Sequence, residues 1–170
     1  MKKNFLRYAL ATLTTFVMAT SLLSAEMASA SPQSLNDFYN SDKIFKIDLT
    51  IGQDSINQLN SSDRNMLKKY TGAQVLFTTQ DGRQSPNISI GLRLKGSTSL
   101  QRLDAQPSFK IKFNWSTLTG QRFLGLKRMT LHAMTQDTSM IHEASAYRLY
   151  NLMGVPAPKT GYAQLFINGT

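Results

Sequence analysis

The 170-residue chain contains no cysteine and only two histidines, His132 and His142. The absence of cysteine excludes disulfide frameworks, thiolate metal sites and cysteine nucleophiles. With only two histidines, a multi-histidine metal site within one chain is not expected. Charged residues make up just 17%, and the 41% hydrophobic content is typical of a globular chain. This composition argues against collagen-like, coiled-coil and disordered classes.

Charge and common motifs exclude further classes. The net charge is +9, but the basic residues are spread along the chain and form no block. This pattern favours a solvated basic surface, and we expect no nucleic-acid partner. The motifs G-x-G-x-x-G, H-E-x-x-H and G-x-S-x-G are absent. The segment 120–127 resembles a phosphate loop in spacing, but Phe123 and Leu124 make it apolar, so we interpret it as a packed turn.

The first thirty residues have the three parts of a secretory signal peptide. A basic start precedes an apolar run over 8–25, and Ala28-Ser29-Ala30 provides a cleavage site before Ser31. The run contains six Ser or Thr residues, so we expect no stable membrane span after cleavage. The expected organisation is a signal peptide over 1–30, a polar lead-in over 31–43 and one domain over 44–170. We therefore expect an exported protein.

Periodicity predicts an α+β fold of mainly antiparallel strands, with one main helix packed on them. Strands are expected at 44–51, around Val75 and Phe77, and at 88–95, 108–114, 128–134 and 164–167, with a hairpin turn at Asp81-Gly82. Two short helices are expected, one capped by Asp54 and one capped by Ser62 or Asp63 and ended by Gly72. The main helix is expected at 138–153, capped by Asp137 or Ser139.

The end of the sequence carries a hairpin signal. Asn168-Gly169 follows the last expected strand, and only Thr170 comes after it. Asn-Gly after an alternating run is a strong signal for a two-residue hairpin turn. We therefore expect a chain that stops partway through a domain.

The segment 93–113 has the order of a kinase-like nucleotide site. A strand leads into a loop of small residues (Gly96, Ser97, Thr98 and Ser99), and the next strand places Lys110 and Lys112 on one face. Loop N–H groups bind phosphate oxygens and a strand lysine neutralises them, with a helix carboxylate as its partner. Glu143 is the candidate carboxylate. The same residues also fit solvated strand lysines and a surface acid near a helix start.

Several motifs in this region resemble the CotH family, the spore-coat protein H kinases and their secreted relatives. The motifs are RLKGSTS (93–99), SFKIKF (108–113), GQRFLGLK (120–127), AYRLY (146–150) and MGVPAPKT (153–160). The resemblance runs from about Ile44 to Thr170 and covers the N-terminal part of the family. It implies an atypical secreted protein kinase that uses ATP and a divalent metal such as Mg²⁺ to phosphorylate spore-coat or cell-surface proteins.

The resemblance also implies which residues meet the nucleotide. Lys112, with Lys110 as second choice, is implied for the ATP phosphates, Glu143 as its partner, and Gly96 to Ser99 as the phosphate loop. The family's catalytic and metal-binding aspartates lie beyond Thr170, so no catalytic or metal residue is carried over. We expect the chain as given to be inactive and located outside the cell, in the envelope or in the spore coat. The alternative is a non-catalytic structural or binding module of the coat or cell surface.

Overall fold

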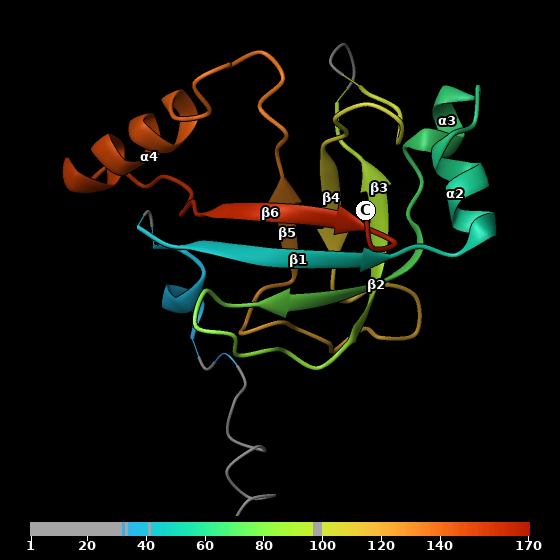
Figure 1. Ribbon diagram of the computed structural model, residues 1–170, viewed down its shortest axis with the longest axis horizontal. Coiled ribbons are helices and arrows are strands. Elements are labelled where there is room, and N and C mark those ends of the chain that lie inside the picture. Colours follow the sequence, from blue (N-terminus) through green and yellow to red (C-terminus); the bar gives the residue numbers. More distant parts are fainter. Residues whose placement is uncertain (1–31, 33, 41, 97–99) are drawn as a thin grey trace, which may run out of the picture. The chain divides into compact units, whose positions relative to one another are not determined.

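The computed structural model describes residues 32, 34–40, 42–96 and 100–170 of the chain. The described part is built around one six-stranded sheet with short helices at its ends (Figure 1). The strands are β1 (Ile44–Thr50), β2 (Thr71–Thr78), β3 (Ile88–Leu94), β4 (Phe109–Lys112), β5 (Arg128–Leu131) and β6 (Tyr162–Ile167). The helices are η1 (Leu35–Asp37), α2 (Gln53–Leu59), α3 (Arg64–Leu67) and α4 (His142–Leu152). No helix in these ranges is long and apolar enough to cross a membrane.

The strands follow the order β5-β4-β3-β2-β1-β6. Neighbours from β1 to β5 pair antiparallel, whereas β6 pairs parallel to β1. The parallel pair is possible because the chain crosses over through α4 before it enters β6. The α+β prediction with mainly antiparallel strands is confirmed. The parallel pairing of β1 with β6 was not predicted from the sequence.

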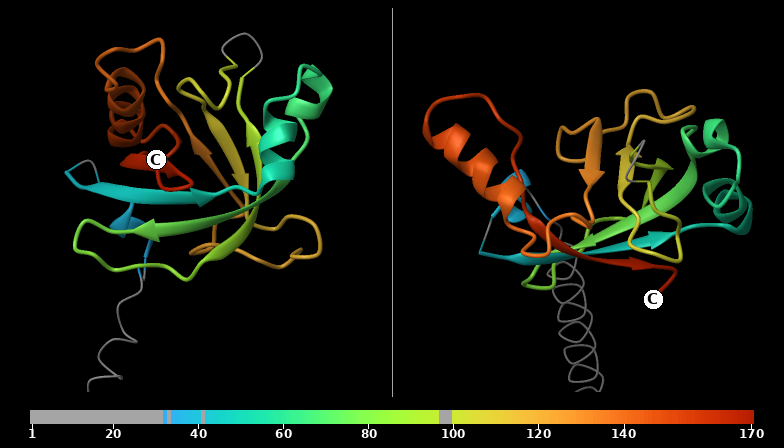
Figure 2. Two further views of the ribbon diagram at one scale, coloured as in Figure 1. Left: turned by 45° about the vertical axis from the view of Figure 1, so that its right-hand side comes forward. Right: turned by 90° about the horizontal axis from the view of Figure 1, so that it is seen from above.

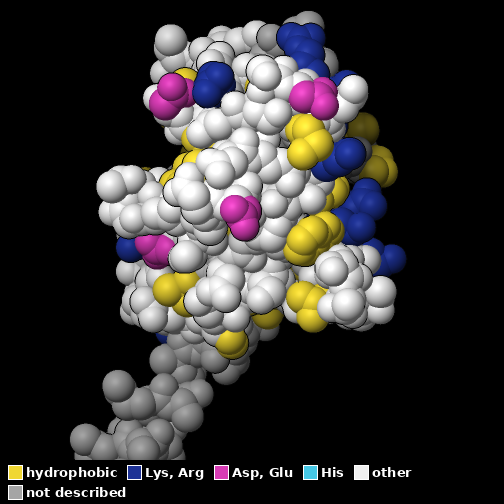
Figure 3. Space-filling model, turned by 90° about the vertical axis from the view of Figure 1, so that its right-hand side faces the viewer, with side chains coloured by type: hydrophobic (Ala, Val, Ile, Leu, Met, Phe, Trp, Pro, Cys, Tyr) yellow, Lys and Arg dark blue, Asp and Glu magenta, His cyan; other side chains and the backbone are white. Residues whose placement is uncertain are grey.

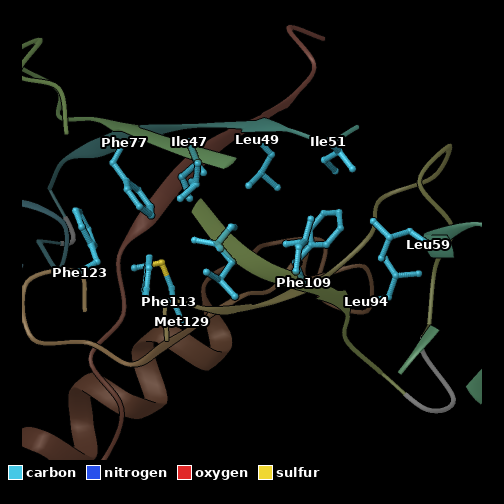
Figure 4. Close-up of a cluster of buried hydrophobic side chains, with 14 of the residues drawn as sticks. Ile47, Leu49, Ile51, Leu59, Phe77, Leu94, Phe109, Phe113, Phe123 and Met129 are labelled. Atoms are coloured by element: carbon cyan, nitrogen blue, oxygen red, sulfur yellow. The ribbon is translucent and has the colours of Figure 1, made fainter. Parts of the chain in front are cut away.

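The core lies on the concave face of the curved sheet (Figures 2 and 4). Alternate residues of each strand point into it, as period-two apolar patterns require. The fully buried side chains from the strands are Ile47, Leu49, Val75, Phe77, Ile90, Leu92, Leu94, Phe109 and Ile111, and Phe113, which directly follows β4, is buried with them. Burying a side chain of this size contributes about 1.5–3 kcal/mol. The residues between them, including Arg93, Lys110 and Lys112, are therefore held on the opposite face.

The lead-in expected over 31–43 supplies a core residue. Phe38 is 1% exposed and lies edge-on to Phe45 and Phe77, with ring centroids 5.1 and 5.7 Å apart. Phe123 stacks on Phe77 at 4.4 Å and also lies edge-on to Phe38 at 5.5 Å. The lead-in is therefore polar in composition but contributes to the core through a single aromatic side chain.

Three turns behave as their sequences predict. Gly82 has a φ of 86° in the turn that joins β2 to β3. Leu124 and Gly125 have φ values of 47° and 86° in the packed turn whose residue Phe123 is buried. Asn168 and Gly169 have φ values of 51° and 87°, as a type I′ hairpin turn requires.

The Asn168-Gly169 turn is closed by two hydrogen bonds and anchored to β1. Ile167 and Thr170 exchange N–H···O bonds of 2.8 and 3.1 Å across the turn. The Asn168 side chain accepts from the Ile51 N–H at 2.8 Å and donates to the Ile51 carbonyl at 3.1 Å. The hairpin turn is thus formed at the end of β6.

The short helices differ from prediction in their boundaries. Gly52, not Asp54, occupies the N-cap of α2, and Asp54 lies in its first turn. Asp63 caps α3 as predicted, since its carboxylate accepts from the Asn65 N–H at 2.8 Å. Gly72 does not end this helix but lies within β2. It can do so because the six-membered ring of Trp115 covers it, 3.4 Å from where a Cβ would lie.

The main helix is shorter and less packed than predicted. α4 begins at His142 instead of 138, because Met140 adopts a left-handed φ of 58° just before it. None of its residues is buried, and Leu149 and Leu152 are 55% and 76% exposed. The expectation that the main helix packs on the strands is therefore wrong for the described part of the chain.

Candidate functional site

The outer face of β3 and β4 carries a row of cationic side chains. In the antiparallel register Arg93 lies opposite Lys110, and Gly91 lies opposite Lys112. Paired residues in adjacent strands share a face, so Arg93, Lys110 and Lys112 project together away from the core. The apolar residues between them fix this orientation, because a one-residue slip would bury the cations.

A pocket of about 580 Å³ lies over this row. It is lined by Lys68, Tyr70, Arg93, Lys95, Gly96 and Lys110. Four of these residues are cationic and none is acidic. None of the four cations makes a salt bridge with any described residue. Figure 3, which looks onto the α2–α3 side, shows Lys and Arg side chains gathered along one margin of the surface. Such a concentration of unpaired positive charge attracts anions.

Aromatic rings border the cations. Tyr70, which directly precedes β2, has the Arg93 guanidinium 5.4 Å and the Lys112 ammonium 5.8 Å from its ring centroid. Trp115 lies against Gly91, where an added Cβ would come within 2.4 Å of the indole Cγ. Cation–π contacts of this kind restrain long basic side chains. Lys112 is thereby directed to Tyr70, whereas Lys110 lines the pocket.

The structure brings together only some of the residues predicted from sequence. Gly96 lines the pocket beside Lys110, with a φ of 118° that favours glycine. Ser97, Thr98 and Ser99 lie outside the described residues. Lys112 is two register positions further along β4 and contacts Tyr70 instead. Of the two predicted lysines, the pocket therefore contains Lys110.

Glu143 is held by neighbours that the sequence did not indicate. Its Oε2 lies 2.5 Å from Nδ1 of His132, the residue that follows β5. Tyr147, one turn along α4, donates a hydrogen bond to the same carboxylate. No salt bridge within the described ranges joins Glu143 to Lys110 or Lys112. The charge of Lys95, which directly follows β3 and lines the pocket, acts on Glu143.

These contacts set the ionisation of Glu143. Partial burial opposes the charged form, but hydrogen bonds from His132 and Tyr147 and the charge of Lys95 outweigh burial and lower the pKa of Glu143 below its ordinary value. The hydrogen bond to this carboxylate in turn raises the pKa of Tyr147. Glu143 is therefore an anion at neutral pH, placed beside the cationic pocket.

A second histidine–carboxylate contact forms the start of α4. Asp137 Oδ2 accepts from the His142 backbone N–H at 3.0 Å, and its Oδ1 lies 2.7 Å from His142 Nδ1. Hydrogen bonds from the Ser139 hydroxyl and from His142 hold the pKa of Asp137 well below its usual range. The Asp137 carboxylate thus accepts a hydrogen bond from a backbone N–H group at the start of α4 that has no partner within the helix, although the helix begins later than predicted.

A divalent metal does not fit the described residues. No group of three or more His, Cys, Asp or Glu side chains lies close enough to hold a metal ion in the part of the chain that is described. Mg²⁺ is bound through carboxylate oxygens together with nucleotide phosphates. The charged residues that line the pocket are all cationic, which suits the phosphates and not the metal.

The residues that sequence reasoning missed are Lys68, Tyr70, Arg93 and Lys95. Arg93 and Lys95 carried a signal, since both alternate with the buried Leu92 and Leu94 and so share the face of Lys110. Lys68 and Tyr70 carried none, because they reach the pocket only through the chain path between α3 and β2.

Comparison with protein families gives one match. Residues 92–170 match the family model described as CotH kinase protein. The matched segment contains β4, β5, α4 and β6 and, in the pocket, Arg93, Lys95, Gly96 and Lys110. No curated protein matches the chain. The family match and the mixed sheet are consistent with a CotH-family protein.

Proposed function

We propose that this CotH-like chain binds ATP through the pocket on the outer face of β3 and β4, and that it serves protein phosphorylation outside the cytoplasm. The observation that carries the proposal is the group of four cations, none in a salt bridge with a described residue, with no acid among the lining residues. The substrate class is a spore-coat or cell-surface protein, as in the family that the sequence resembles.

The chemistry of the pocket suits a polyphosphate. ATP carries three to four negative charges at neutral pH, and ammonium and guanidinium groups make strong charge-assisted hydrogen bonds to phosphate oxygens. Lys110 and Arg93 approach from adjacent strands, and Lys95 and Gly96 from the end of β3. We assign Lys110 to the phosphates, with Lys112 as the alternative, because Lys110 lines the pocket.

Glu143 acts on the site through Lys95. In kinases a helix carboxylate positions the lysine that meets the phosphates. Here the carboxylate at the start of α4 acts on Lys95, at the rim of the pocket. We propose that Glu143 restrains Lys95 while Lys110 remains available to the ligand. The described residues hold no cluster of three or more candidate metal ligands, so no catalytic residue is assigned.

A second candidate function is a structural or binding module of the coat or cell surface. The exposed apolar side chains of α4 favour it, since Leu149, Leu152 and Met153 are each more than half exposed. Such side chains are typical of surfaces that contact other proteins. This function predicts partner binding that does not depend on Lys110.

ATP binding separates the two functions. Trp115 is the single tryptophan and lies beside the cationic row, so its fluorescence can report titration with ATP. Lys110→Ala should weaken ATP binding about tenfold or more, as expected for loss of a hydrogen bond to a charged group. Lys159→Ala, an exposed lysine outside the pocket, is the matched control and should bind as the wild type does. Equal affinities of the two variants would exclude the proposed site.

Export and transfer have separate tests. N-terminal sequencing of the protein recovered from the culture medium or envelope should begin at or near Ser31. Retention of residues 1–30 in the mature protein would contradict export. Transfer is tested with γ-labelled ATP and extracted spore-coat proteins, and label in a coat protein that Lys110→Ala abolishes would support the kinase function over the structural module.

A further inference from the structure

The imidazole of His132 holds the first turn of α4 to the sheet through Glu143. The Nδ1···Oε2 distance is 2.5 Å, and the two side chains are 39% and 36% exposed. α4 buries none of its own residues, so apolar packing does not fix the position of its first turn. The contact between His132 and Glu143 therefore contributes strongly to the position of the Glu143 carboxylate.

The same contact lies next to the pocket. His132 stands two residues after Thr130, which pairs with Lys110 in the sheet. His132 is therefore the diagonal neighbour of Lys110 across the two strands, a relation that places side chains about 7–8 Å apart, within the Debye length of about 8 Å at physiological salt. Lys95, which lines the pocket, is close enough for its charge to act on Glu143. The charge of the His132–Glu143 pair therefore contributes to the electrostatic potential at the place where the ligand phosphates would lie.

We infer that His132 is a positioning residue that sets, through Glu143, how strongly the pocket attracts phosphate, and that this effect changes with pH. The inference rests on the proposed ATP site. Histidine is the side chain whose ordinary titration falls between pH 5 and 8. When His132 is protonated, its charge neutralises Glu143 and leaves Lys95 and Lys110 to the phosphates. When His132 is neutral, the Glu143 charge acts on Lys95 without compensation and opposes the phosphates.

The groups around His132 are few. Glu143 contacts it from α4, and Tyr147 and Lys95 act on the Glu143 carboxylate. Lys110 pairs with Thr130, two residues before His132. The other histidine, His142, is bonded to Asp137 and is 82% exposed. It provides a matched control, because it is also an imidazole paired with a carboxylate, but within the described residues no hydrogen bond or salt bridge joins Asp137 to a pocket-lining residue.

The test measures ATP affinity of the full chain at pH 5.5 and pH 8.0 for the wild type, His132→Gln and His142→Gln. Glutamine keeps a hydrogen-bond donor for Glu143 but does not titrate. Dividing the affinity of each variant by that of the wild type at each pH removes the titration of ATP itself. We expect the wild type to gain roughly three- to tenfold over His132→Gln on going from pH 8.0 to 5.5. His142→Gln should follow the wild type at both pH values.

The outcomes distinguish the two proposals. ATP binding with the same pH dependence in the wild type and in His132→Gln would overturn the role of His132 and leave the ATP site intact. An equal change in both histidine variants would also overturn it, since it would show a general effect of charge. No ATP binding at either pH would overturn the proposed function and the role of His132 together.

Discussion

Replacing Gly91 by alanine should destabilise the protein through one identified clash. The added Cβ would lie 2.4 Å from Cγ, 2.6 Å from Cδ1 and 2.8 Å from Cβ of Trp115. These atoms include the root of the side chain and the ring, so rotation of a flexible end cannot relieve the contact. Overpacking of this kind costs about 1–3 kcal/mol. For a domain of this size the melting temperature should fall by roughly 3–12 °C.

Two glycines provide graded controls for this measurement. An added Cβ at Gly72 would lie 3.4 Å from the far edge of the same ring, and one at Gly120 would meet nothing within 4 Å. We expect Gly91→Ala to be the least stable of the three variants, Gly72→Ala to be intermediate, and Gly120→Ala to be close to the wild type. Thermal unfolding followed by far-ultraviolet circular dichroism gives the three values.

A second substitution tests the assignment of the clash to Trp115. In a Trp115→Leu background the added methyl of Gly91→Ala has room, so its cost should fall to a small fraction of the value in the wild type. Equal stability of Gly91→Ala and Gly120→Ala would refute the reasoning. So would an undiminished cost of Gly91→Ala in the Trp115→Leu background.

Three further predictions concern α4 and the approach to β6. The pKa values of Asp137 and Glu143 are both lowered, so their stabilisation is present above the ordinary carboxyl range and is lost as pH falls. Hydrogen exchange should therefore show the start of α4 opening below about pH 4, and unchanged protection there would contradict it. Gly161→Ala places a Cβ 2.0 Å from the Phe38 carbonyl oxygen and should lower the melting temperature, unlike Gly120→Ala. Leu152→Lys, at a side chain that is 76% exposed, should leave the melting temperature unchanged in thermal unfolding, and a fall of several degrees would contradict its exposure.

The sequence predicted those parts of the fold that local patterns determine. The alternation of Phe109, Ile111 and Phe113 with two lysines fixed both the strand and the face on which the lysines lie. The φ requirements of Asp81-Gly82 and Asn168-Gly169 fixed the turns in the same way. Such features depend on neighbouring residues only, so one sequence is sufficient to find them.

Features that depend on distant residues were not predicted. The parallel pairing of β1 with β6 joins segments about a hundred residues apart, and no local pattern specifies it. Phe38 enters the core although its neighbours are polar, because Phe45, Phe77 and Phe123 surround it in space. The contact of Glu143 with His132 likewise depends on where the turn before α4 directs the helix.

Direct mapping of the lysines that ATP protects is the measurement closest to the central claim. The protein is acetylated with and without ATP, and modification of each lysine is measured by mass spectrometry. Our account predicts that ATP protects Lys68, Lys95 and Lys110, which line the pocket, and leaves Lys43 and Lys159 unprotected. Protection that is equal at all lysines, or confined to lysines outside the pocket, would contradict an ATP site on the outer face of β3 and β4.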